Sequence, residues 1–166
     1  MMKRLAIFSF LILANFFVHA QAVNKNTSSA SKRTILFVCE HGAGRSAIAA
    51  AFFNRMTKEQ NLNYHAIFRG IHPDSAVGTA IRNGLIKDSF DINGWKPILL
   101  SKQDIQNAHR VVTLDCLLPE NGSSAYNSRL WTGIPIGKGY IEARDEIINK
   151  LQPLVLELKK EESGKN

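Results

Sequence analysis

The chain has 166 residues, of which 45% are hydrophobic and 21% charged, and a formal net charge of +7 at pH 7. This length suits one domain with its own core, and the ordinary composition excludes a fibrous or intrinsically disordered protein. The basic residues are scattered, without a Lys/Arg block or interleaved aromatic residues, so a nucleic-acid-binding protein is not expected. Two cysteines, Cys39 and Cys116, are too few for a disulfide-rich scaffold.

The N-terminus has the three parts of a secretory signal peptide. Lys3 and Arg4 precede an apolar run over residues 5–18, and the small residues Ala20 and Ala22 follow it. A retained membrane anchor is the alternative, but this run is shorter than the roughly 20 residues that a spanning helix needs. We therefore expect the segment 1–22 to be removed by cleavage after Ala20 or Ala22. The mature protein is then exported, periplasmic or secreted, with no membrane attachment.

The first strand of the domain is expected directly after a short polar leader. Residues 23–32 are small and polar, which is typical of a flexible segment. Ile35–Val38 is a continuous apolar run of the kind found in strands buried on both faces, and it ends at Cys39. Glycines follow at once, and residues 46–56 are rich in helix formers. The pattern predicts a strand, a tight glycine loop and a helix.

Strands and helices continue to alternate along the rest of the chain. The expected elements are a strand over 64–71, a helix capped by Asp74 or Ser75 and ending near 88, a short helix opened by a Ser101–Asp104 capping box, a strand over 111–114, a short strand over 130–134, and a last helix from Tyr140 that Pro153 bends. This alternation predicts one α/β domain over 33–158, built on a parallel sheet with helices on both faces. A solvated tail is expected over 159–166.

The loop after the first strand combines a thiol with an anion-binding backbone. In open α/β sheets, ligands bind beyond the carboxyl ends of the strands, where Cys39 lies. The loop residues are small enough for their N–H groups to converge in front of a helix N-terminus, which attracts anions and favours a thiolate. We expect the substrate to be bound by Glu40, His41, Gly42, Ala43 and Gly44, together with Arg45.

Three side chains of this segment have expected catalytic roles. Cys39 is the nucleophile. The planar guanidinium of Arg45 can hold two oxygens of a tetrahedral anion at once. The hydroxyl of Ser46 can donate a hydrogen bond to the thiolate. Together they predict a site that binds a tetrahedral oxyanion beside a reactive sulfur.

The segment from Cys39 to Ser46 resembles the Cys-x5-Arg-Ser loop of low-molecular-weight protein tyrosine phosphatases. It is also similar to the Cys-x-His-Asn-Ala-Gly-Arg-Ser loop of their relatives, the thioredoxin-coupled arsenate reductases. The resemblance extends over about residues 33–157, through Phe68-Arg-Gly70, Val111–Leu114 and Ala143–Ile147. It implies a four-stranded parallel sheet in flavodoxin-like order. It also implies hydrolysis of phosphate monoesters, phosphotyrosine-like ones above all, through a phosphocysteine on Cys39.

The sequence departs from the family at the general acid. The phosphatases carry an Asp-Pro general acid on a loop beyond the third strand, and the counterpart here is Trp131–Pro135, with Ile134 in place of the aspartate. An isoleucine cannot transfer a proton. Asp115, at the carboxyl end of the third strand, is the first candidate to replace it, and Glu40, Asp74 and Glu120 are the others. A further departure is Gly42, where the family loop usually has asparagine.

The sequence is compatible with two other functions. The related reductases pass oxidation along three cysteines, so arsenate reduction here would use Cys116 as the redox partner of Cys39, with no third cysteine available. A non-catalytic oxyanion-binding module is the remaining alternative. The histidines show no metal-ligand spacing, and we expect neither a metal nor a cofactor. The expected partner is a phosphorylated small molecule or a phosphoprotein.

Overall fold

The computed structural model describes residues 31–119 and 128–164. The signal peptide expected over 1–22 and most of the leader lie outside these residues. In chain order the elements are β1 (Arg33–Cys39), α1 (Arg45–Glu59), β2 (Tyr64–Gly70), α2 (Thr79–Lys87), α3 (Lys102–Asn107), β3 (Arg110–Leu114), β4 (Ser128–Trp131), the short 3-10 helix η1 (Ile136–Lys138) and α5 (Tyr140–Ser163). No helix among the described residues is both long and apolar enough to cross a membrane.

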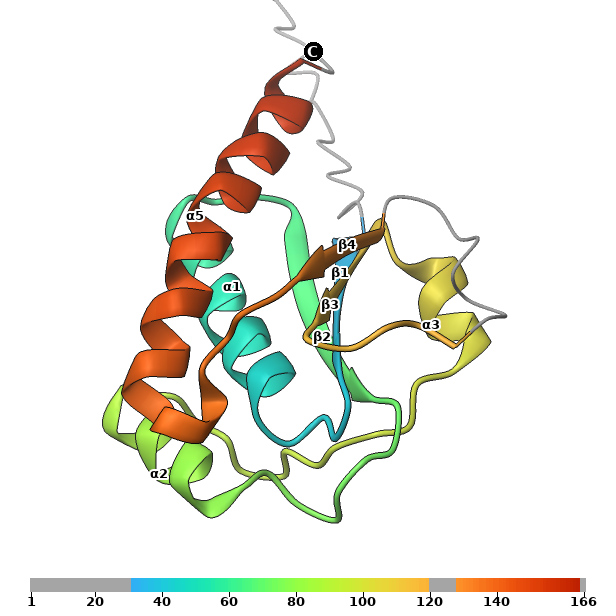
Figure 1. Ribbon diagram of the computed structural model, residues 1–166. Coiled ribbons are helices and arrows are strands. Elements are labelled where there is room, and N and C mark those ends of the chain that lie inside the picture. Colours follow the sequence, from blue (N-terminus) through green and yellow to red (C-terminus); the bar gives the residue numbers. More distant parts are fainter. Residues whose placement is uncertain (1–30, 120–127, 165–166) are drawn as a thin grey trace, which may run out of the picture.

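The strands form one four-stranded sheet in the order β2-β1-β3-β4, with every neighbouring pair parallel. Helices α1, α2 and α5 cover one face of this sheet, and α3 lies against the other (Figure 1). The predicted parallel sheet with helices on both faces is therefore confirmed. Because β1 is an inner strand flanked by β2 and β3, its carboxyl end opens at the middle of the sheet edge.

The alternation of side chains along β1 divides the core into two parts. Ile35, Phe37 and Cys39 face the larger cluster, to which α1 and α5 contribute. Leu36 and Val38 face a smaller cluster on the α3 side. Successive side chains of a strand point to opposite faces, so Cys39 is directed toward the face that α1 covers.

Helix α2 and strand β4 differ in position from the prediction. Helix α2 begins at Thr79, after Gly78 as its N-cap, and not at the Asp74 or Ser75 cap expected. The reason is that residues 71–78 run along the loop after β1 and donate their N–H groups to it. Strand β4 covers 128–131 and not 130–134. The capping box of Ser101 and Asp104 is present as predicted.

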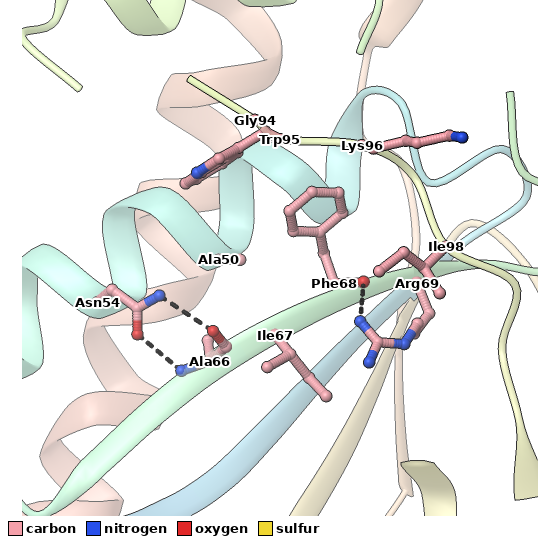
Figure 2. Close-up of a pocket in the computed structure, with 10 residues that line it drawn as sticks. All are labelled: Ala50, Asn54, Ala66, Ile67, Phe68, Arg69, Gly94, Trp95, Lys96 and Ile98. Carbon is pink, nitrogen blue, oxygen red and sulfur yellow. Dashed lines mark hydrogen bonds between the residues drawn. The ribbon is translucent and has the colours of Figure 1, made fainter. Parts of the chain in front are cut away.

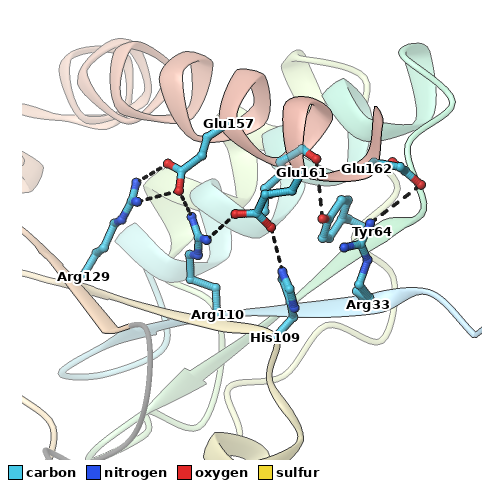
Figure 3. Close-up of polar contacts among 9 residues, drawn as sticks. Arg33, Tyr64, His109, Arg110, Arg129, Glu157, Glu161 and Glu162 are labelled. Carbon is cyan, nitrogen blue, oxygen red and sulfur yellow. Dashed lines mark hydrogen bonds and ion pairs between the residues drawn. The ribbon is translucent and has the colours of Figure 1, made fainter. Parts of the chain in front are cut away.

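The last helix is longer than expected. Helix α5 continues past Pro153 and ends at Ser163, so residues 159–163 are helical and not part of a solvated tail. Its final turns are fixed to the sheet by ion pairs, because Glu157 and Glu161 both contact Arg110, and Glu162 contacts Arg33 (Figure 3). Short-range sequence patterns do not reveal these long-range contacts.

Candidate active site

The loop between β1 and α1 is held against the end of β2 by two glycines. Gly42 has a φ of +63°, in the left-handed region that glycine adopts freely. A Cβ atom on Gly42 would lie 2.9 Å from the backbone nitrogen of Gly70, and a Cβ atom on Gly70 would lie 2.8 Å from the nitrogen of Gly42. Glycine is therefore required at 42 both by its conformation and by this close approach.

The carbonyl groups of the loop are turned away from its centre by the chain that follows β2. The N–H groups of that segment donate to them at 2.8 to 3.2 Å, in the pairs Ile71 to Cys39, His72 to Glu40, Asp74 to His41 and Gly78 to Ala43. Within the part of the chain that the structure describes, no N–H group of residues 40–44 donates to a protein acceptor. Such unused donors at a helix N-terminus are suited to the oxygens of an anion.

The thiol of Cys39 lies beside the hydroxyl of Ser46, as the sequence predicted. The Sγ–Oγ distance is 3.1 Å. Both side chains are buried, with exposed fractions of 3% for Cys39 and 0% for Ser46. A hydroxyl at this distance can donate its proton to a thiolate and stabilise its charge.

Arg45 is the first residue of α1, and its guanidinium is anchored through one nitrogen. Its Nε donates to the carbonyl oxygen of Ile134 at 3.3 Å and lies 3.1 Å from Oδ2 of Asp115. Among the described residues the two Nη atoms have no hydrogen-bond partner. The arginine is thus oriented by Nε, and its terminal nitrogens are left for the oxygens of a bound anion.

Asp115 holds the loop after β4 as well as Arg45. Its carboxylate accepts the N–H groups of Gly133 at 2.7 Å and of Ile134 at 3.0 Å. Its own N–H donates to the carbonyl oxygen of Trp131 at 2.8 Å, and its φ of +50° is unusual for a residue other than glycine. Because both carboxylate oxygens are acceptors here, the geometry fits a positioning residue better than the general acid that the sequence suggested.

The other acid candidates lie at the exposed rim of the loop or outside the described residues. Glu40 pairs with His72 at 2.7 Å, and His41 lies 3.5 Å from Asp74. Both histidine side chains are largely exposed, at 77% for His72 and 61% for His41. Glu120 is outside the described residues. Each contact joins the loop to the segment after β2, because Glu40 and His41 lie in the loop while His72 and Asp74 lie in that segment.

Cys116 lies near the nucleophile but on the other side of the sheet. Both cysteines are free thiols, and Cys116 belongs to the small cluster that includes Val38, whose carbonyl oxygen is 3.5 Å from its Sγ. Burial, with a smaller effect of the charge of Cys39, raises the pKa of Cys116 to about 11. A thiol in this environment is a poor nucleophile at neutral pH.

One further residue of the site was not identified from the sequence. Gly70 forms the wall against which Gly42 packs, and its position directly after the last large residue of β2 was the available signal. Trp131 packs on the core, where its ring lies beside that of Phe37 with centroids 5.8 Å apart and planes inclined by 45°. Within the described residues, no group of three or more His, Cys, Asp or Glu side chains is arranged to hold a metal ion.

Several proteins of known structure share this arrangement of strands and helices. YfkJ from Bacillus subtilis superposes with a TM-score of 0.68 at 19% identity, over 79% of this chain and 97% of that one. The YwlE arginine phosphatase from Geobacillus stearothermophilus gives 0.66 at 20% identity, over 81% and 97%. The thioredoxin-dependent arsenate reductase of Corynebacterium glutamicum gives 0.62 at 20% identity, over 80% and 64%. Protein tyrosine phosphatases, including a low-molecular-weight one from T. tengcongensis, share the fold as well.

The chain has the low-molecular-weight phosphatase fold. In sequence it is 26% identical over 125 residues to a Halobacterium salinarum protein named "Putative arsenate reductase". The aligned region spans 74% of this chain and 87% of that protein. No protein-family model matches the sequence. At these identities the likeness establishes the fold, which phosphatases and arsenate reductases share, and the site residues must decide between the two activities.

Proposed function

We propose that this chain is an exported, cysteine-dependent phosphatase that hydrolyses phosphate monoesters of the phosphotyrosine type. The observation that carries the proposal is the buried Cys39 thiol, 3.1 Å from Ser46, at the start of a loop with unused N–H donors that ends at Arg45. Thiolate, oxyanion donors and guanidinium are the groups that phosphoryl transfer to sulfur requires.

The reaction has two steps. The Cys39 thiolate attacks phosphorus, an S–P bond forms, and the ester P–O bond breaks as its electrons pass to the leaving oxygen. The loop N–H groups and the Nη atoms of Arg45 stabilise the charge on the equatorial oxygens. Water then attacks the phosphocysteine, inorganic phosphate leaves, and the thiolate returns to its hydrogen bond with Ser46.

Among the described residues we find no carboxylic acid placed to protonate the leaving group, so we expect this proton to come from solvent. Asp115 accepts hydrogen bonds at both oxygens, and Ile134 is buried with an exposed fraction of 3%. Enzymes that lose a general acid typically lose about 10²–10⁴-fold in rate. Esters with good leaving groups, such as aryl phosphates, are therefore the expected substrates.

Arsenate reduction is the second candidate, supported by the names of the relative from H. salinarum and of the reductase structure. A reductase needs a second thiol to resolve the oxidised Cys39. Burial and the raised pKa of Cys116, about 11, favour the phosphatase. A non-catalytic anion-binding module would share the loop but produce no turnover.

Hydrolysis of p-nitrophenyl phosphate under reducing conditions tests the proposal. We expect turnover that Cys39→Ser abolishes and that the matched variant Cys116→Ser retains. Absence of turnover with retained binding of phosphate would instead favour the binding module. Arsenate-dependent loss of free thiols that requires Cys116 would favour the reductase.

Export is a proposal that rests on the N-terminal sequence alone. The basic pair, the apolar run and the alanines at 20 and 22 support removal of the first residues by a signal peptidase. The intact mass of the protein recovered from periplasmic and cytoplasmic fractions tests it. A mass that retains residue 1 in the cytoplasmic fraction alone would contradict export.

A further inference from the structure

Two pairs of side chains join the anion-binding loop to the segment after β2, and they are arranged reciprocally. The loop contributes the carboxylate of Glu40, which lies 2.7 Å from Nδ1 of His72. It also contributes the imidazole of His41, whose Nδ1 lies 3.5 Å from Oδ1 of Asp74. The backbones of the same residues are joined as well, because His72 donates its N–H to Glu40 at 2.8 Å and Asp74 donates to His41 at 3.0 Å. We refer to these four residues as the rim of the loop.

The contacts of the two imidazoles determine where each of them can take up a proton. The groups that face Nδ1 of His72 and of His41 are a carboxylate at 2.7 Å and a backbone carbonyl at 3.3 Å, and both are acceptors. Nδ1 therefore carries the hydrogen in the neutral form of each ring. Nε2 has no partner among the described residues, and the two side chains are 77% and 61% exposed. A proton added at Nε2 breaks no contact and makes the bonds from Nδ1 charge-assisted.

Protonation of both imidazoles changes the net charge of the rim from −2 to 0. The two carboxylates contribute −2 and the neutral imidazoles nothing, whereas two imidazolium groups add +2. Histidine is the side chain that ordinarily changes its charge between pH 5 and 8. In weakly alkaline solution the loop therefore has two uncompensated negative charges beside it, and in weakly acidic solution it has none.

The charged groups on the neighbouring elements form a constant background. Arg69, at the end of β2, bends back onto the backbone of its own strand (Figure 2) and pairs with Asp104 of α3 at 2.8 Å. On α1, Arg45 pairs with Asp115 at 3.1 Å. Arg82, on α2, is exposed. Carboxylates and guanidinium groups ordinarily keep their charge between pH 5.5 and 8, so the histidines are the rim groups that respond to pH in this range.

We propose that the rim couples anion binding to proton uptake by His41 and His72, and that it thereby favours dianions as the pH falls. A dianion held by the N–H groups of the loop stabilises both imidazolium groups, and by reciprocity their protonation raises the affinity for the dianion. A monoanion gains less, because the interaction is proportional to its charge. The inference deepens the proposed function by assigning a charge preference to its anion site, and it rests on that site but not on turnover.

Sulfate titrations of the Cys39→Ser variant test the proposal, because sulfate stays a dianion over the whole range and the thiol no longer titrates. Amide shifts of the ¹⁵N-labelled protein at constant, low ionic strength give the Kd at pH 5.5 and at pH 8. We expect the Kd to be about tenfold lower at pH 5.5, since each exposed charge pair changes an equilibrium by about threefold. Perchlorate, a tetrahedral monoanion, should show a change of only about threefold.

Variants in the same Cys39→Ser background assign the effect to its residues. His41→Gln and His72→Gln keep a hydrogen-bonding side chain without a charge, so each should reduce the change to about threefold, and the double variant should abolish it. His72→Lys should lower the Kd at pH 8 about threefold, because lysine is charged at both pH values. The matched control is His109→Gln, which alters a histidine paired with Glu161 at the amino end of β3, and it should keep the full change.

Equal Kd values for sulfate at the two pH values would overturn the inference. A pH effect that the double variant retains, or that perchlorate shows to the same extent, would also overturn it. Absence of sulfate binding at either pH would overturn it together with the anion site. The proposed phosphatase is tested separately, by turnover of p-nitrophenyl phosphate in the chain that keeps Cys39, so the two can fail independently.

Discussion

The carboxylate of Asp115 and the guanidinium of Arg45 are joined through Oδ2 and Nε at 3.1 Å. The same carboxylate accepts the N–H groups of Gly133 and Ile134, so one side chain fixes both the anion clamp and the loop after β4. In the proposed phosphatase, a residue with these contacts would act by orienting Arg45. Catalytic effects of such positioning are large, because about 1 Å of misplacement can cost about 10²-fold in rate.

The variant Asp115→Asn tests this role. Asparagine keeps a single acceptor oxygen and has no charge, so it cannot hold Gly133, Ile134 and Arg45 together, and kcat/KM for p-nitrophenyl phosphate should fall about 10- to 100-fold. The dependence of the rate on the leaving group should stay the same as in the wild type. The control Asp145→Asn removes a 56% exposed carboxylate elsewhere and should leave kcat/KM unchanged. A loss confined to poor leaving groups would show instead that Asp115 is the proton donor.

The lack of a side-chain acid among the described residues predicts a steep dependence of the rate on the leaving group. With Ile134 buried and Asp115 used as an acceptor, the described residues offer phenolate no proton as it departs. We expect phenyl phosphate to be hydrolysed at least about 10²-fold more slowly than p-nitrophenyl phosphate, the lower end of a general acid's usual contribution. Steady-state kinetics over a series of substituted phenyl phosphates measures this slope. Similar rates across the series would reveal a proton donor that the described residues do not contain.

The sequence predicted the local part of the site and missed the contacts that bring it together. Cys39, Arg45 and Ser46 are close in sequence, so strand, loop and helix propensities alone place them side by side. The role of Asp115 depends on residues 18 and 19 positions away, and its sequence neighbours carry no sign of that pairing. The start of α2 was wrong for the same reason. Residues 71–78 are fixed by hydrogen bonds to the loop after β1, which outweigh the capping preference of Asp74.

Gly42 and Gly94 offer a comparison of two left-handed glycines. Their φ angles are +63° and +74°, but an added Cβ at Gly42 meets the backbone of Gly70, whereas at Gly94 it meets nothing within 4 Å. Gly94→Ala should therefore cost only the strain of the conformation, about 1–2 kcal/mol. Gly42→Ala should cost about 1–3 kcal/mol more, because the backbone has to move. Denaturant unfolding measures both values, and equal losses would contradict the contact with Gly70.

Thiol reactivity should separate the two cysteines. The pKa of Cys116 is about 11, so near pH 8 only about one molecule in a thousand carries its thiolate. Iodoacetamide should modify Cys39 and inactivate the protein while Cys116 stays unmodified. Mass spectrometry of the digested protein at successive times measures both sites. Prior saturation with inorganic phosphate should slow the reaction of Cys39 alone. Comparable rates at the two cysteines would contradict the raised pKa of Cys116.

The stability of the C-terminal turns of α5 should depend on two ion pairs that share a buried arginine. Arg110 has a side-chain exposure of 7% and contacts Glu157 and Glu161 at 2.6 Å each (Figure 3). Hydrogen bonds from Arg129 and Arg110 outweigh burial and hold the pKa of Glu157 below its ordinary 4.5. Burial would raise the pKa of Glu161, but His109 and Arg110 lower it overall. Both carboxylates therefore stabilise the fold above about pH 4.5, and this contribution is lost as the pH falls through their lower folded-state values.

The double variant Glu157→Gln/Glu161→Gln removes both negative charges around Arg110. Breaking a fully buried pair costs about 3–5 kcal/mol, and the partial exposure of Glu157, 37%, reduces the expected loss here to about 2–3 kcal/mol at neutral pH. The control Glu146→Gln, in the same helix, breaks an i,i+4 pair with Lys150 and should cost about 0.3–0.5 kcal/mol. Urea unfolding at neutral pH and below pH 4 should show the variant and the wild type converging in acid. A constant difference between them at every pH would exclude these carboxylates as the source of the acid sensitivity.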